Sequence, residues 1–217
     1  MINKLQCEVE EWFNSTEYGK KRYIHTLGVM EMALSLNKIN NFKVAEWKIK
    51  TAALLHDVGK MLDEATMLTI IRNNKEMLEI TDKDFLTLES TPNVWHGYVS
   101  VYLAITKFKV KNKEILKAIK YHTTGNKKMS RLSQLIYLSD AVEKNRTYQN
   151  VEKYREITLN NFDLGLITVM KDIIKMLESN GEIVHPLSYE ALKYYERVTN
   201  GKKEISKNSL WCFKGFR

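Results

Sequence analysis

The feature that most limits the fold of this chain is the spacing of its apolar residues, which recur every three to four positions along most of its length. Only 2 prolines and 9 glycines interrupt the pattern in 217 residues, and 44% of the residues are hydrophobic. Because proline and glycine destabilise helix interiors, their scarcity favours an all-α fold with one sizeable core. We expect helices near residues 3–13, 16–38, 42–58, 63–73, 82–88, 93–108, 112–123, 129–142, 151–180 and 187–199.

The charge and the cysteine content limit which binding partners and which cellular compartment we expect. The chain has 34 basic and 26 acidic side chains, a net charge of +8, which favours anionic partners without identifying them. Cys7 and Cys212 lie near opposite ends, so neither a disulfide framework nor a zinc–cysteine site is expected. No apolar run reaches the roughly 18 residues of a membrane span, and the first twelve residues do not resemble a signal peptide. We therefore expect a cytoplasmic protein without a membrane partner.

The last segment, residues 200–217, is basic and contains three large aromatic residues, Trp211, Phe213 and Phe216. Leaving such side chains in water costs about 1.5–3 kcal/mol each. We expect this tail to pack back onto the domain; docking onto another molecule is the alternative.

Four of the five histidines and two aspartates lie on or beside predicted core faces. His25, His56, His96 and His122 each fall on an apolar stripe, Asp140 extends another, and Asp57 follows His56 in the stretch "AALLHDVGK". Separate hydrogen-bonded polar groups would explain this pattern, and for a single histidine that is the commoner explanation. A buried carboxylate, however, must find cations or donors, so one shared set of metal ions is the more economical hypothesis. Imidazole and carboxylate ligands suit iron, manganese, zinc, cobalt or nickel.

The sequence segments around these residues resemble those of a known family. "RYIHTLGVMEMA", "AALLHDVGK", "WHGYVSVYLA", "AIKYHTTGNKKMSRLSQLIYLSDAVEKNRTY" and "IVHPLSYEALKYY" resemble the HD-domain metal-dependent phosphohydrolases, and among them the bacterial YqeK family of symmetrical bis(5'-nucleosyl)-tetraphosphatases. The similarity spans roughly residues 15–197 and includes all five histidines. It implies a single HD-domain helical bundle with a central metal site over residues 15–199. Residues 1–14 would then be an N-terminal helical extension, and residues 200–217 a C-terminal tail.

The resemblance also implies a site with two metal ions. Iron is the expected metal, with manganese, cobalt, nickel and zinc as alternatives. Matched position by position, the first metal's ligands are His25, His56, Asp57 and Asp140, with Asp57 bridging; the second metal's are His96 and His122. We place His56 and Asp57 at the end of one helix, where consecutive side chains diverge by about 100° and reach neighbouring points of the site.

Candidate phosphate-binding residues lie close to these ligands in the sequence. Lys60 follows "HDVG" and Arg146 lies six residues after Asp140, so with Asp57 they form the proposed catalytic set. The proposed substrate-binding residues are Lys60, Thr123, Thr124, Gly125, Arg146 and His185. Taken singly, each charged residue could be a solvated surface residue, and each turn residue could serve only to end a helix. His185 has two alternatives, contacting the nucleotide or capping a turn.

Two features near the ligands leave the roles of Arg22 and Arg146 open. Arg22, three residues before His25, is a candidate to pair with an acidic ligand or with phosphate. Relatives commonly read Glu-Pro-Gly-Arg where this chain has Glu143, Lys144, Asn145 and Arg146. The arginine is kept but the turn chemistry differs, so the direction of Arg146 is not fixed by the resemblance.

The activity implied by the resemblance is symmetrical hydrolysis of dinucleoside tetraphosphates. Diadenosine tetraphosphate and water would give two ADP, by attack of a metal-activated hydroxide on an inner phosphorus. The alternatives are an HD phosphohydrolase acting on a nucleoside monophosphate, a cyclic nucleotide or a hyperphosphorylated nucleotide, or a non-catalytic nucleotide- or RNA-binding regulator. The expected ligand is a dinucleoside polyphosphate or a purine nucleoside diphosphate. We do not expect nucleic acid as a partner, and a homodimer is compatible with the sequence.

Overall fold

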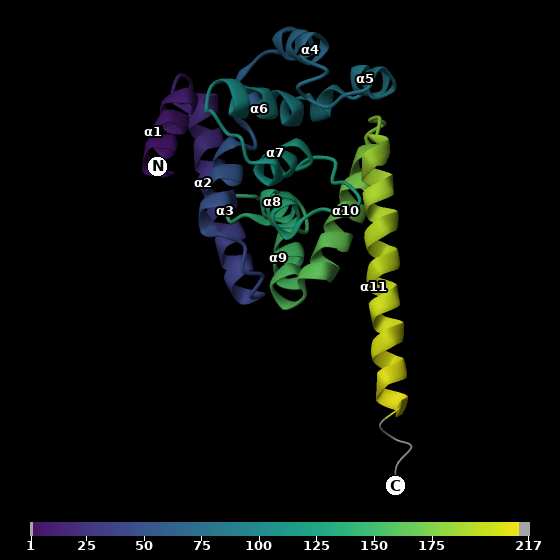
Figure 1. Cartoon of the computed structure of the whole chain (residues 1–217). Coiled ribbons are helices and arrows are strands. Elements are labelled where there is room, and N and C mark those ends of the chain that lie inside the picture. Colours follow the sequence, from purple (N-terminus) through teal and green to yellow (C-terminus); the bar gives the residue numbers. More distant parts are fainter. Residues whose placement is uncertain (1, 213–217) are drawn as a thin grey trace.

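The computed structural model describes the backbone of residues 2–212 and the side chains of residues 2–200. The described residues form helices joined by turns and loops, with no strand among them, which confirms the all-α prediction (Figure 1). Its elements are α1 (Ile2–Phe13), α2 (Glu17–Ile39), α3 (Glu46–Leu55), η1 (Val58–Met61), α4 (Glu64–Asn73), α5 (Asp82–Glu89), η2 (Pro92–Val94), α6 (Trp95–Thr106), α7 (Lys113–Lys120), α8 (Arg131–Val142), α9 (Val151–Asn160), α10 (Phe162–Ser179) and α11 (Pro186–Cys212).

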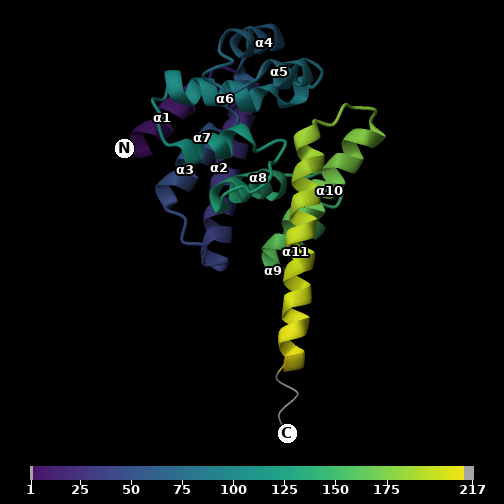
Figure 2. The same ribbon diagram turned by 45° about the vertical axis from the view of Figure 1, so that its right-hand side comes forward.

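The core lies where α2, α3, α7 and α8 pack against one another. Leu36, Leu54, Ile119 and Leu135, one from each of these helices, are fully buried. Helix α6 covers one end of this group and carries α4 and α5 on its outer side, while α9, α10 and α11 lie at the other side (Figures 1 and 2). The four central helices therefore form the scaffold from which a buried site can be built.

The expected helix over residues 42–58 is shorter than predicted at both ends. Asn37 keeps the segment before α3 out of a helix, because its amide exchanges two hydrogen bonds with the backbone of Val44. At the other end α3 finishes at Leu55, and Asp57 leaves the helical conformation with φ −111° and ψ 7°. The prediction that His56 and Asp57 share a helix is therefore wrong: His56 is the C-cap of α3, and Asp57 begins the turn beyond it.

Neighbouring side chains stabilise this turn after α3. Trp12 donates its indole N–H to the carbonyl of Val58, and the Gly59 amide donates to Ser100 Oγ at 2.9 Å. A Cβ at residue 59 would lie only 2.6 Å from the carbonyl oxygen of His96, so glycine allows the turn to lie directly on α6. This contact brings the segment with Asp57 against the helix that carries His96.

Two further boundaries differ from the prediction. The expected single helix over 151–180 is two helices, because the chain turns at Asn161, which has φ −154° and caps α10 by accepting from the Leu164 amide. Helix α11 does not end near residue 199 but continues to Cys212, since one glycine at 201 costs only about 1 kcal/mol in an otherwise helix-compatible stretch.

The C-terminal half of α11 extends away from the rest of the bundle (Figures 1 and 2). The boundary predicted between residues 199 and 200 therefore falls within this helix. The expected packing of Trp211, Phe213 and Phe216 concerns side chains outside the described part of the chain. No helix in the part that the structure describes has both the length and the apolar content to cross a membrane.

Candidate metal centre

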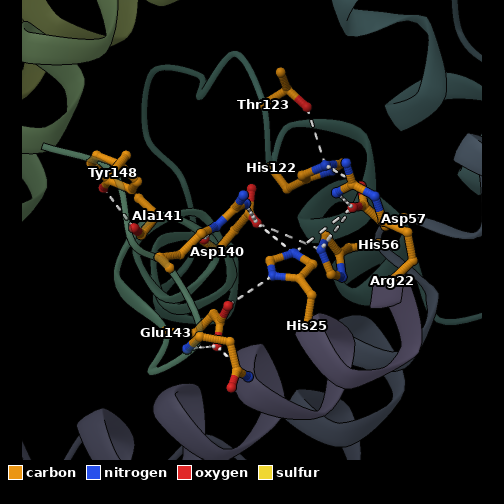
Figure 3. Close-up of polar contacts among 12 residues, drawn as sticks. Arg22, His25, His56, Asp57, His122, Thr123, Asp140, Ala141, Glu143 and Tyr148 are labelled. Atoms are coloured by element: carbon orange, nitrogen blue, oxygen red, sulfur yellow. Dashed lines mark hydrogen bonds and ion pairs between the residues drawn. The ribbon is translucent and has the colours of Figure 1, made fainter. Parts of the chain in front are cut away.

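Six side chains predicted as metal ligands meet in the interior of the bundle. His25 comes from the middle of α2, His56 and Asp57 from the turn after α3, and Asp140 from α8. His96 lies in the first turn of α6, and His122 follows the end of α7. Figure 3 shows His25, His56, Asp57, His122 and Asp140 converging on one region from different parts of the fold. His56 and Asp57 are fully buried, so the pair that the sequence made conspicuous lies at the centre of this cluster.

The two carboxylate oxygens of Asp57 face different pairs of histidines. Asp57 Oδ2 is 3.8 Å from His25 Nε2 and 3.6 Å from His56 Nε2. Asp57 Oδ1 is 3.6 Å from His96 Nε2 and 3.3 Å from His122 Nε2. One carboxylate thus separates two groups of nitrogen ligands, which is the arrangement that a bridging ligand requires.

Asp140 belongs to the His25 and His56 side of the cluster. Its Oδ1 is 2.9 Å from His25 Nε2 and 3.8 Å from His56 Nε2. Three groups of residues could each hold an ion, because the ligand atoms within each group all lie within 4.8 Å of one another. The groups are His25, His56 and Asp57; His56, His122 and Asp140; and Asp57, His96 and His122.

Backbone contacts fix the orientation of two of the imidazoles. His56 Nδ1 is 2.7 Å from the carbonyl of Ala53, and His122 Nδ1 is 2.7 Å from the carbonyl of Ile119. A carbonyl can only accept, so Nδ1 donates in both rings. In the neutral ring the lone pair is then on Nε2, the atom that faces the cluster, as in most protein metal sites with histidine ligands.

Several buried ligand atoms face one another without making a well-directed hydrogen bond. His25 Nε2, His56 Nε2 and Asp57 Oδ1 are buried without a hydrogen bond. The Nε2 atoms of His96 and His122 lie 3.1 Å apart, so two potential lone pairs converge. Leaving one buried polar group unpaired costs about 1–3 kcal/mol, and cations among these atoms would remove that cost. The donor set therefore fits metal ions.

The protonation states of His56, His96 and Asp57 agree with metal binding. Burial lowers the pKa of His56 and lowers that of His96 well below its usual value, so both rings are neutral near pH 7. Burial alone would raise the pKa of Asp57, but the charge of Lys60 and the contacts with the surrounding histidines, His122 among them, together hold this pKa well below its usual range. Neutral imidazole and ionised carboxylate are the forms that bind metal.

Glu143 is a functional candidate that the sequence analysis did not assign to the site. Its side chain is 1% exposed, and its Oε1 is 3.1 Å from His25 Nδ1. Its other oxygen accepts from the backbone and side-chain amides of Asn145, at 2.7 and 2.9 Å. A Cβ at Gly28 would lie 2.1 Å from this oxygen, so glycine in α2 makes room for it. Because Glu143 follows the end of α8, it lies outside the apolar stripe that pointed to Asp140.

Three cations contact the two acidic ligands. Arg22 Nη1 and Lys60 Nζ lie 3.2 and 3.1 Å from Asp57 Oδ2, and Arg146 Nη2 lies 2.6 Å from Asp140 Oδ1. The side chains of Arg22, Lys60 and Arg146 are 24%, 22% and 30% exposed. Each cation therefore contacts its own carboxylate partner and also solvent. The structure thus places Lys60 and Arg146, together with Arg22, at the edge of the cluster.

The remaining predicted substrate residues lie in different surroundings. Thr123 Oγ1 is 3.1 Å from the Nε2 atoms of both His96 and His122. Thr124 is buried and donates to the carbonyl of Gly125, which adopts a left-handed conformation with φ +68°. His185 is buried just before α11, where its Nδ1 accepts from the Leu187 amide. The structure brings Thr123 to the cluster, whereas Thr124 and His185 make hydrogen bonds within their own turns.

Comparison with known proteins agrees with this geometry. Residues 22–145 match the model of the HD domain, so the chain belongs to the HD-domain family. It is 32% identical to the symmetrical bis(5'-nucleosyl)-tetraphosphatase of Bacillus subtilis (strain 168), over 76% of this chain and 84% of that protein. It is 30% identical to the protein of the same name from Staphylococcus aureus (strain NCTC 8325 / PS 47), over 81% of this chain and 87% of that one.

A solved structure has the same fold. It is described as a predicted HD superfamily hydrolase involved in NAD metabolism from Clostridium acetobutylicum, with a TM-score of 0.77 and 29% sequence identity. The match covers 88% of this chain and 96% of that one. The expectation of an HD-domain helical fold is confirmed.

Proposed function

We propose that this HD-domain protein hydrolyses dinucleoside tetraphosphates symmetrically, so that diadenosine tetraphosphate and water give two ADP. The observation that carries the proposal is the position of Asp57, whose two oxygens each face a separate pair of histidines. The names of the relatives from Bacillus subtilis and Staphylococcus aureus supply the substrate class.

The charges of the site suit a polyphosphate. Three buried or partly buried carboxylates, Asp57, Asp140 and Glu143, are matched by three cations, Arg22, Lys60 and Arg146. Because these charges cancel, the positive charge of bound metal ions would remain available to an anionic substrate. When bound, two metal ions would activate a water molecule and neutralise charge on the phosphoryl oxygens.

The chain's own residues would hold the substrate over the cluster. Arg146 presents a planar guanidinium that can bind two phosphate oxygens at once, and Lys60 a compact ammonium group for charge that develops in the transition state. Thr123 places a hydroxyl beside His96 and His122, where it can donate to a phosphate oxygen. A nucleoside diphosphate is a good leaving group, so the reaction does not require a dedicated general acid.

We propose iron as the metal, with manganese, cobalt, nickel and zinc as alternatives. All of the candidate ligands are imidazole nitrogens and carboxylate oxygens, the donor types that these metals accept. Elemental analysis of protein purified without oxygen distinguishes among the five.

Chromatography of the products from diadenosine tetraphosphate tests the proposal. We expect ADP alone, whereas ATP and AMP in equal amounts would contradict symmetrical cleavage. Asp57→Ala should lose metal and turnover together. Asp82→Ala, which removes an exposed carboxylate paired with Lys75, is the matched control and should retain both. Full activity of Asp57→Ala would overturn the site assignment.

A second candidate comes from the solved structure, whose description connects that protein with NAD metabolism. The same ligands would then act on another nucleotide, such as a nucleoside monophosphate or a cyclic or hyperphosphorylated nucleotide. Rates on a panel of these compounds separate the two candidates. Tight nucleotide or RNA binding without hydrolysis, in the presence of iron or manganese, would favour a regulator instead.

A further inference from the structure

The turn after α8 carries two residues that contact the cluster of candidate metal ligands. Glu143 contacts His25, and Arg146 contacts Asp140, although the two residues lie on an irregular segment. The last carbonyl groups of a helix have no partner within the helix and are often satisfied by water. The position of both side chains therefore depends on what holds the backbone of this turn.

A single side chain from another helix binds this backbone at three points. Arg155, in α9, donates from Nε to the carbonyl of Val142 at 2.9 Å. Its Nη2 donates to the carbonyls of Glu143 and Arg146, at 2.6 and 2.7 Å. The planar guanidinium fork can reach several acceptors in fixed directions, which a lysine ammonium group cannot reproduce. Two of the three carbonyls belong to the residues that contact the cluster.

Arg155 acts at a distance from the cluster itself. Its remaining contact is an ion pair with Glu152, one turn earlier in α9, and its side chain is 14% exposed. Its three carbonyl partners all lie in the backbone of Val142, Glu143 and Arg146. Any effect on catalysis must therefore pass through the turn.

We propose that Arg155 is a positioning residue, which fixes Glu143 for His25 and aims Arg146 at the substrate. This inference rests on the proposed function for its effect on turnover, but its effect on metal binding does not depend on the substrate. The turn itself lacks the proline and glycine that the resemblance associates with this place. Its shape rests on the hydrogen bonds of Arg155, on those of Asn145 with Glu143, and on those of Arg146 with the carbonyls of Asp140 and Glu143.

The test compares Arg155→Ala and Arg155→Lys with the wild type, using Mn²⁺ as the metal probe. We expect Arg155→Ala to bind Mn²⁺ about tenfold more weakly, as is typical when a group that supports a ligand is lost. The KM for diadenosine tetraphosphate should rise by a similar factor. Arg155→Lys should show most of both losses, because it keeps the charge but not the fork. Arg72→Ala, which removes an exposed guanidinium paired with Glu89, is the control and should behave as wild type.

Chemical rescue separates positioning from general destabilisation. Millimolar guanidinium chloride should restore Mn²⁺ affinity and KM in Arg155→Ala, whereas sodium chloride at equal ionic strength should not. Wild-type Mn²⁺ affinity in Arg155→Ala, or a loss that guanidinium leaves unchanged, would overturn the proposal. If Arg155→Ala does not fold, the Mn²⁺ affinity of Arg155→Lys decides, and a wild-type value would reject it. If the wild type makes no ADP, the proposed function fails while the Mn²⁺ affinities still test Arg155.

Discussion

At the scale of single residues, Asp57 shows how this chain tolerates a fully buried carboxylate. Burial alone would favour the neutral acid, yet Lys60 and the surrounding imidazoles keep it ionised. Its Oδ2 is shared by Arg22 and Lys60, while its Oδ1 has no hydrogen bond among the described residues. The asymmetry leaves Oδ1 facing His96 and His122, where a metal ion would bind.

Glu143 should control metal affinity through His25. The change Glu143→Gln keeps the shape of the side chain but removes the negative charge that orients and polarises the imidazole. We expect the affinity for Mn²⁺ to fall by about 10- to 100-fold, the usual effect of losing such a support. Glu31→Gln, at an exposed partner of Lys144, is the control. Equal Mn²⁺ affinities of Glu143→Gln and the wild type, measured by titration, would show that Glu143 does not support the ligand.

His185 should make stability depend on pH. Burial lowers its pKa, against the opposing influence of Asp84 and Glu190. Below about pH 6.5 the unfolded chain binds a proton that the native state resists, so the free energy of unfolding falls as pH falls through this window. His185→Asn keeps an acceptor for the Leu187 amide but does not titrate. Urea unfolding at a series of pH values should show that the free energy of unfolding of His185→Asn falls less steeply with decreasing pH than that of the wild type. Equal pH dependence of the two proteins would contradict the explanation.

At the scale of elements, the break between α9 and α10 depends on a cap. Asn161 accepts from the Leu164 amide at 3.0 Å and has an extended backbone, so it starts α10 without glycine or proline. Asn161→Ala should lower the free energy of unfolding by about 0.5–2 kcal/mol, whereas Asn161→Asp should retain most of it. Asn160→Ala, at the exposed end of α9, is the control. Equal urea midpoints for Asn161→Ala and Asn160→Ala would argue against the cap.

The same elements show what the sequence could and could not predict. Apolar periodicity located most helices and placed five of the six ligand candidates on inward faces, because burial imposes that spacing; Asp57 was identified only as the neighbour of His56. It missed the break at Asn161, since the pattern continues across it, and it extended the helix through Asp57, whose turn depends on contacts with Trp12 and Ser100. Glu143 and Arg155 were missed because their positions depend on tertiary contacts that have no periodic signal.

At the scale of the whole molecule, five separate segments meet at one buried point, so the site exists only in the folded bundle. α2, α3 and α8 supply one side of Asp57, while α6 and the segment after α7 supply the other. Bound metal should therefore stabilise the native state, by an amount that rises with the logarithm of the free metal concentration once this exceeds the dissociation constant.

A two-metal centre divided by Asp57 fixes the number of metal ions that the protein should contain. Elemental analysis of wild-type protein purified without oxygen should give about two metal ions per chain, because each oxygen of Asp57 would serve one ion. His96→Ala should retain about one, since the His25, His56 and Asp140 side is left intact. One ion per chain in the wild type, or two in His96→Ala, would contradict the division.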